Sequence, residues 1–214
     1  MSGSNQFPFP AVPASRAAFV EQEFHAGRDL RSGDTGAPSA AEVVEFWRQA
    51  GASMWFAKDA DFDRRFRENF LEAHEAAARG DLDNWMTTPE GALALLVLLD
   101  QFPRNAFRGT PRMYATDAAA RRIAAAAVDA GHDRQMPRDL RTFFYLPFAH
   151  SEYLADQDRS VALCGPLGPP DSAHSERHRD IVKRFGRFPH RNPILGRKMT
   201  AEEQEFLDQG GYAG

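Results

Sequence analysis

The sequence contains one cysteine, Cys164, among its 214 residues. A single cysteine excludes an intrachain disulfide bond and a zinc site that is built from several cysteines. A lone thiol is typical of proteins from reducing compartments, and the residues beside Cys164 include no base that would activate it. We therefore interpret Cys164 as a structural residue rather than a nucleophile.

Long apolar runs, secretion signals and an excess of positive charge are missing as well. The longest apolar run, residues 92–99, is far shorter than the roughly 20 residues that a membrane-spanning helix needs. The N-terminal residues lack the basic start and apolar segment of a secretion signal. The net charge of -4 provides no overall basic field for nucleic acid. We expect a cytoplasmic protein that binds neither membranes nor nucleic acids.

Signals for β-structure are absent too. No segment alternates between apolar and polar residues over a strand length, and no Asn-Gly or Asp-Gly pair marks a hairpin. We predict an all-α protein of about seven helices with short connections, so that most neighbouring helices form antiparallel pairs. Residues 1–38 are rich in Pro, Gly and Ser, and we interpret them as a poorly ordered or loosely docked arm with a short helix around Ser15–Arg28. Residues 39–214 form the single helical domain.

The starts of the helices are marked clearly. Ser39 with Glu42, and Thr200 with Glu203, have the spacing of capping boxes, in which each side chain satisfies a free backbone N–H. The segment that follows Thr88 is apolar on all sides, which predicts a central buried helix. We expect helices from Ser39 to Gly51, over residues 59–79, from Thr88 to about Pro103, from Thr110 to about Gly131, from Arg138 to about Leu163 with an interruption at Pro147, from His174 to about Phe185, and from Thr200 to Gly210.

Two corners of the chain resemble each other. FPRN at residues 102–105 and FPHRN at residues 188–192 each follow a helix and precede a glycine and a threonine-capped helix. Proline should end or kink the helix at each corner, and the Arg and Asn that follow could bond the last free carbonyls. This structural explanation needs no ligand, and binding of a ligand is the alternative.

The same residues carry a family resemblance. LLDQFPRNAFRGTPRMYATD (98–117), FFYLPFAHSEYLADQDRSVAL (143–163) and RFGRFPHRNPILGR (184–197) closely resemble motifs of the domain of unknown function 924 family. The similarity covers roughly residues 40–210. It implies a tetratricopeptide-like stack of antiparallel helix pairs, and it implies no particular activity.

The polar residues in these motifs are candidates for chemistry. Asp100 and Arg104 have the spacing of a helical ion pair beside the most apolar segment. His150 follows Pro147 within an aromatic helix pattern, so that it is either a core histidine bonded to a backbone carbonyl or a binding or general-base histidine.

The basic stretch RFGRFPHRN has two interpretations. A continuous helix would align Arg184, Arg187 and Arg191, and like charges that are stacked in this way need carboxylate partners or an anion. One interpretation is a network of salt bridges that ties the last helices to the core. The other is that Arg104, Arg187, His190 and Arg191 converge on a bound carboxylate or phosphate.

The sequence contains no complete motif for binding a metal or a cofactor. His174 and His178 have the spacing of a helical metal pair, but they lack the H-E-x-x-H order and lie in a highly charged segment, which we interpret as a solvated face. No glycine-rich phosphate loop is present. We expect no metal and no cofactor.

Three functions remain open. The first is a binding module for a small anionic metabolite or a peptide carboxylate. The second is a cofactor-free hydrolase or lyase, in which His150 or His190 is the base and Glu152 orients it. The third is a protein-interaction scaffold. The candidate ligand-binding residues are Asp100, Arg104, Asn105, Arg108, His150, Glu152, Arg184, Arg187, His190, Arg191 and Asn192.

Overall fold

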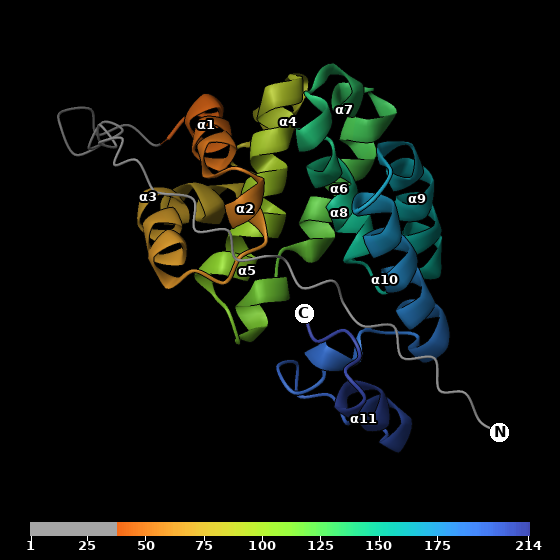
Figure 1. Ribbon diagram of the computed structural model, residues 1–214. Coiled ribbons are helices and arrows are strands. Elements are labelled where there is room, and N and C mark those ends of the chain that lie inside the picture. The colour runs from red at the N-terminus through yellow and green to blue at the C-terminus, as the bar shows by residue number, and fades with distance from the viewer. Residues whose placement is uncertain (1–37) are drawn as a thin grey trace, which may run out of the picture. The chain divides into compact units, whose positions relative to one another are not determined.

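The computed structural model describes residues 38–214, and that part of the chain is helical without any strand (Figure 1). The predicted all-α class is therefore confirmed, whereas the tetratricopeptide-like stacking stays a prediction. No helix within residues 38–214 is long and apolar enough to cross a membrane. The predicted N-terminal arm, with its helix around Ser15–Arg28, lies outside the described residues.

The described residues contain more helices than the sequence predicts, because two of the expected long helices are divided and two short helices, Ala52–Trp55 and His132–Gln135, are additional. The helices are α1 (Ala40–Ala50), α2 (Ala52–Trp55), α3 (Ala60–Arg79), α4 (Pro89–Leu96), α5 (Phe102–Ala106), α6 (Asp117–Asp129), α7 (His132–Gln135), α8 (Thr142–Ala149), α9 (Leu154–Cys164), α10 (Asp171–Phe185) and α11 (Ala201–Asp208).

The capping boxes form as predicted. The side chain of Ser39 accepts from the backbone N–H of Glu42 at the start of α1, and the Glu42 carboxylate accepts in return. Thr200 and Glu203 repeat the arrangement at the start of α11. These local bonds fix where both helices begin.

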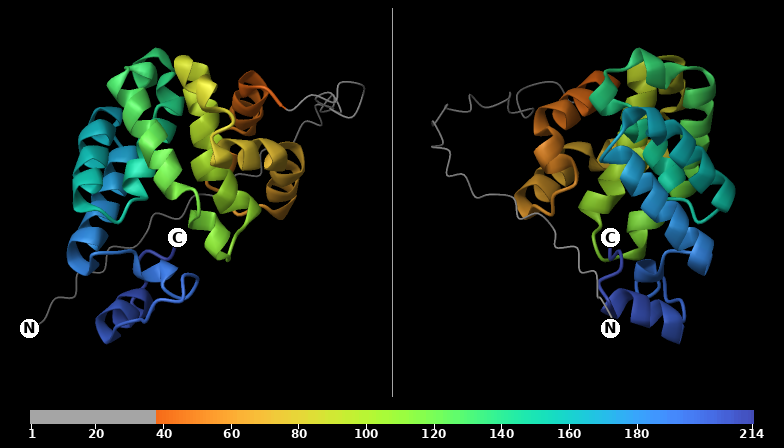
Figure 2. Two further views of the ribbon diagram at one scale, coloured as in Figure 1. Left: turned by 180° about the vertical axis from the view of Figure 1, so that it is seen from behind. Right: turned by 45° about the vertical axis from the view of Figure 1, so that its right-hand side comes forward.

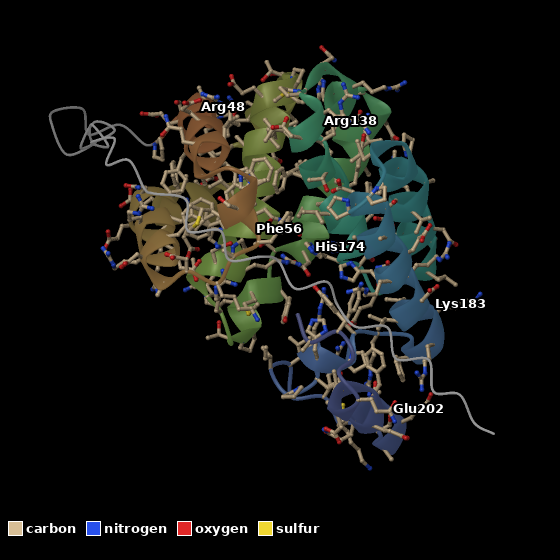
Figure 3. All side chains as sticks on the ribbon, viewed as in Figure 1. Arg48, Phe56, Arg138, His174, Lys183 and Glu202 are labelled. Atoms are coloured by element: carbon tan, nitrogen blue, oxygen red, sulfur yellow. The ribbon has the colours of Figure 1, made fainter. Side chains whose placement is uncertain are left out.

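Helix α4 lies at the centre of the core. Every residue from Gly91 to Pro103 is buried, which confirms the predicted central helix. Figures 1 and 2 show α1 and α3 on one side of α4, and α6 and α8 on the other. Charged side chains such as Arg48, Arg138 and Glu202 lie on the outside (Figure 3).

The helix that begins at Thr88 does not end near Pro103, as the sequence predicts. It continues through a π-helical turn, Val97–Gln101, into α5, which ends at Ala106. Pro103 lies in the first turn of α5, where its missing N–H costs little. The next segment also differs, because Thr110 is followed by the 3-10 helix Pro111–Tyr114 and α6 begins only at Asp117.

The break between α8 and α9 lies after Pro147, which is inside α8 rather than at the interruption. Residues 150–153 form the break. Gln157 of α9 is 0% exposed, and its side-chain amide donates to the carbonyls of Ala149 at 2.7 Å and Ser151 at 2.6 Å. This amide supplies a donor to carbonyls that the end of α8 leaves open, and so it fixes the chain on both sides of His150.

Candidate functional site

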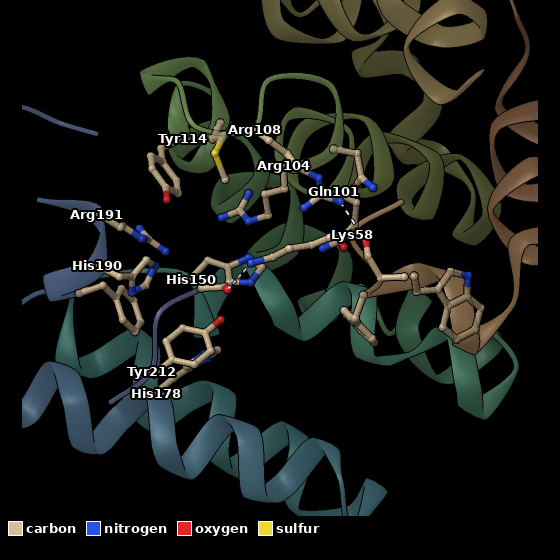
Figure 4. Close-up of a pocket in the computed structure, with 17 residues that line it drawn as sticks. Lys58, Gln101, Arg104, Arg108, Tyr114, His150, His178, His190, Arg191 and Tyr212 are labelled. Carbon is tan, nitrogen blue, oxygen red and sulfur yellow. Dashed lines mark hydrogen bonds between the residues drawn. The ribbon is translucent and has the colours of Figure 1, made fainter. Parts of the chain in front are cut away.

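A cavity of about 210 Å³ lies where the two Phe-Pro corners meet (Figure 4). Its walls come from the chain after α2, from α5 and the π turn before it, from the 3-10 helix Pro111–Tyr114, and from the corner at residues 188–191. His150, His178 and the residues Tyr212 and Gly214 complete the pocket. The resemblance of the two corners therefore has a spatial counterpart, because both line one cavity.

Arg104 and Arg191 come from the two corners and share one carboxylate. Nη1 of Arg104 lies 2.9 Å from Oδ1 of Asp117, and Nη1 of Arg191 lies 3.6 Å from Oδ2. The Arg191 guanidinium also lies 4.7 Å from the ring centre of Tyr114 and 4.5 Å from that of Phe188. Figure 4 shows both guanidinium groups and the Tyr114 hydroxyl turned toward one another. The two guanidinium groups together form one positively charged side of the pocket.

Several buried nitrogen atoms around the pocket have no hydrogen-bond partner among residues 38–214. Arg191 is 7% exposed, and its Nε is without a partner there. The same holds for Nη2 of Arg104 and for Nδ1 of His178 and His190. Buried polar atoms in folded proteins are nearly always paired, and leaving one unpaired costs free energy. A bound acceptor in the pocket would satisfy the two guanidinium nitrogens.

Asp100 orients His150. The Asp100 side chain is 1% exposed, and its Oδ1 accepts from Nδ1 of His150 at 2.8 Å. Gln101 donates to the other oxygen at 2.6 Å, and Nη1 of Arg104 lies 3.2 Å from Oδ1. Burial alone would raise the pKa of the Asp100 carboxyl, but the charges of Arg104 and His150 outweigh burial and lower it. The ionised carboxylate holds the proton of His150 on Nδ1, which leaves Nε2 as the acceptor.

All three pocket histidines favour the neutral form. Burial, followed by the charge of Arg104, lowers the pKa of His150. Burial and then the neighbouring His150 lower the pKa of His178 to about 3. Burial and then Arg191 lower the pKa of His190 to about 4. At neutral pH these rings can donate or accept hydrogen bonds, but they add no positive charge.

Glu152 does not orient His150, so that part of the sequence-based hypothesis is wrong. Its carboxylate accepts from the backbone N–H of Phe188 at 2.8 Å and from Nη1 of Arg197 at 2.6 Å. Glu152 lies in the break between α8 and α9, and its side chain contacts the corner at residues 188–192. His150 lines the cavity beside Asp100 instead. Glu152 therefore supports the corner from outside the pocket.

Arg184, Arg187 and Asn192 are also outside the pocket. Helix α10 ends at Phe185, and Gly186 follows with a left-handed φ of 70°, so the arginines of the basic stretch are not aligned on one helix. Arg184 donates to Glu202 and Arg187 donates to Glu203, both on α11. Asn192 accepts from Arg197. Arg184 and Arg187 therefore form salt bridges to α11, as in the network interpretation of the basic stretch, although the carboxylates that they meet do not belong to the main core.

Asn105 and Arg108 do line the pocket, and both are held by Asp63 of α3. The Asn105 amide donates to Oδ1 of Asp63 at 2.7 Å, and Nε of Arg108 donates to Oδ2 at 2.5 Å. The pocket therefore brings together Arg104, Asn105, Arg108, His150, His190 and Arg191 of the predicted residues, with Asp100 directly behind them.

Sequence reasoning missed His178 and several of its neighbours. His178 is 7% exposed rather than solvated, and its ring packs edge-on against Tyr212 at 4.8 Å. The helical spacing of Ser175, His178 and Val182 would have revealed the buried face of α10. Other missed residues are Lys58, Gln101, Tyr114 and Tyr212, which line the pocket, and Asp117, which holds both arginines.

No group of three or more His, Cys, Asp or Glu side chains within residues 38–214 has the arrangement of metal ligands. Arginine, histidine and tyrosine side chains line the pocket, and their N–H and O–H groups can donate to an anion.

Comparisons with other proteins agree with the motifs. The family model described as "Bacterial protein of unknown function (DUF924)" matches residues 43–211. The solved structure of a protein of unknown function from Agrobacterium tumefaciens is 56% identical, with a TM-score of 0.79, over 80% of this chain and 97% of the other. No curated protein matches the sequence.

Proposed function

The chain belongs to the DUF924 family of bacterial proteins of unknown function, and from its pocket we propose that it binds a small organic anion. We place this function in the cytoplasm, as the single cysteine indicates. The anion is a metabolite carboxylate or the carboxylate of a short peptide. The predicted scaffold function is less favoured, because charged groups converge on the cavity.

The observation that carries the proposal is the pairing of Arg104 with Arg191. Two guanidinium groups share the carboxylate of Asp117, and each keeps a buried nitrogen without a partner in the described chain. A planar carboxylate can accept two parallel hydrogen bonds from one guanidinium. An anion in the cavity would therefore supply the acceptor that these two nitrogens lack.

Binding can be tested by thermal shift and isothermal titration with organic acids and phosphate. We expect stabilisation of the wild type, since a ligand that binds only the folded state raises its stability. Arg191→Gln should abolish this effect. Arg184→Gln is the matched control, because Arg184 pairs with Glu202 at the surface and does not line the pocket. The proposal fails if no anion stabilises the wild type, or if both variants respond alike.

A second candidate function is general-base catalysis. The observation that favours it is the bond between Asp100 and Nδ1 of His150, which leaves Nε2 unprotonated in the pocket. Such a base could take a proton from a bound anion or from water, as a hydrolase or lyase requires. Each anion that binds should be incubated in D2O with the protein and followed by proton NMR for conversion or C–H exchange. Catalysis should vanish in His150→Gln, and unchanged spectra with the wild type would rule it out for those anions.

A further inference from the structure

We infer that the ligand of this pocket is a monocarboxylic acid with an apolar body of about one ring in size, such as an arylacetic acid. The inference rests on the proposed anion binding and names its chemical class. Charge, apolar lining and size each support it independently.

The charges of the pocket leave at most one excess positive charge. Four cations line the cavity, and three carboxylates lie against three of them. The fourth cation, Lys58, donates to the main-chain oxygen of Gly214 at 3.1 Å, and no Asp or Glu side chain within residues 38–214 forms an ion pair with it. The three pairs are Arg104 with Asp100, Arg191 with Asp117, and Arg108 with Asp63. The pocket therefore offers a counter-charge for at most one bound negative charge.

A dianion would need a second positive charge that the pocket does not provide at neutral pH. The histidines are the only other lining side chains of the described chain that could become cationic, and burial keeps them neutral. Protonation of His178 or His190 would also place a new cation beside arginines. A phosphate dianion or a dicarboxylate therefore suits this site less well than a monocarboxylate.

Aromatic and apolar side chains form another part of the wall. Trp55 and Phe56 contribute from the end of α2, and Met113 contributes from the 3-10 helix. The Phe56 ring is 63% exposed, although it is large and apolar. An inorganic anion would leave these apolar side chains exposed to water. A ligand with an apolar body would cover them and so bind more tightly.

The cavity limits the size of this body. Its volume is about 210 Å³, below the roughly 300–1,000 Å³ of pockets that hold drug-sized ligands. One ring with a short acid side chain fits this space better than a peptide or a nucleotide. Phenylacetate is therefore a suitable probe.

The test is isothermal titration with phenylacetate and with three matched compounds. Phenylacetamide keeps the ring without the charge, succinate doubles the charge, and inorganic phosphate removes the apolar body. We expect phenylacetate to bind at least about tenfold more tightly than each of the others. Arg191→Gln should weaken phenylacetate binding by about tenfold or more and leave phenylacetamide unchanged.

Phe56→Ala provides an independent variant, because an exposed ring can be removed without opening the core. It should weaken phenylacetate binding by several-fold and leave acetate binding unchanged. A preference for succinate or phosphate, or no effect of Phe56→Ala, would overturn this inference while the anion site stands. If none of the anions binds, the proposed function fails as well. If phenylacetamide binds as tightly as phenylacetate, the pocket is an apolar site and both proposals fail.

Discussion

Arg104 and Arg191 bind opposite oxygens of the same carboxylate, that of Asp117. The arginines come from two corners that are distant in sequence, and Asp117 is the first residue of α6. One side chain therefore connects three separate segments. Without it, two buried cations would face each other with no shared counter-charge.

Replacing Asp117 with asparagine should destabilise the protein. We expect Asp117→Asn to lower the free energy of unfolding by roughly 1–3 kcal/mol, the typical loss for a hydrogen bond to a charged group. Urea denaturation measures the change. Asp129→Asn is the control, because Asp129 lies in the same helix and its side chain is 71% exposed in a surface pair with Arg159. Equal effects of the two variants would contradict a special role of Asp117.

Stability should fall at acidic pH because of the buried histidines. Burial lowers the pKa of His178 to about 3, below its ordinary value of 6.5. Between these two values the unfolded chain binds a proton that the folded chain does not, so the free energy of unfolding decreases as the pH falls below about 6.5. Urea denaturation at pH 7.5, 6.5 and 5.5 should show this loss.

The histidine contribution can be isolated by substitution. His178→Gln should reduce the loss by up to about 1.4 kcal/mol per pH unit below pH 6.5. His174→Gln, at an exposed position of the same helix, is the control and should keep the pH dependence of the wild type. If both variants follow the wild-type profile, His178 does not govern the acid sensitivity.

Gln157 should hold the break between α8 and α9. Gln157→Leu keeps a similar volume but removes the amide that donates to Ala149 and Ser151. We expect a loss of roughly 1–3 kcal/mol in unfolding free energy, because buried carbonyls are left unsatisfied. Hydrogen exchange should accelerate over residues 148–153. Gln204→Leu, on the exposed side of α11, should change neither quantity.

The ion pair between Glu152 and Arg197 should matter more than the pair between Glu202 and Arg184. Glu152 and Arg197 are 25% and 24% exposed, whereas both partners of the second pair are more than half exposed. Glu152→Gln should cost roughly 1–3 kcal/mol, because its carboxylate also accepts from the backbone of Phe188. Glu202→Gln should stay within about 0.5 kcal/mol. Thermal denaturation of both variants checks the order, and the reverse order would disprove it.

The parts of the fold that depend only on residues close together in the sequence could be predicted. The capping boxes at Ser39 and Thr200, and the apolar helix after Thr88, follow from local spacing and composition, and all three are present. The end of that helix could not be predicted, because packing around Phe102 keeps Pro103 within a helix. The break after Pro147 depends likewise on the distant amide of Gln157.

The candidate site was predictable only in part, for the same reason. The two Phe-Pro corners are rich in Arg and Asn, which marks them in the sequence. Arg104 and Arg191 of these corners do converge on one carboxylate. Their common partner, Asp117, is the last residue of the motif at residues 98–117, but its spacing does not mark it as the partner of both arginines. His178 lies among charged residues that conceal one buried face of α10. Which carboxylate meets which arginine is set by tertiary packing, and no local pattern encodes it.

The π-helical turn Val97–Gln101 has a consequence for how this protein tolerates changes in length. A π turn holds one residue more than an α-helical turn, so deleting one residue from it returns the stretch to α-helix and keeps the two flanking segments in register. Arg104, which lies beyond the turn, would then stay beside Asp117. Substitutions of Val97, Leu98 and Leu99 need only remain apolar, whereas Asp100 and Gln101 are bound by their hydrogen bonds to His150 and to each other.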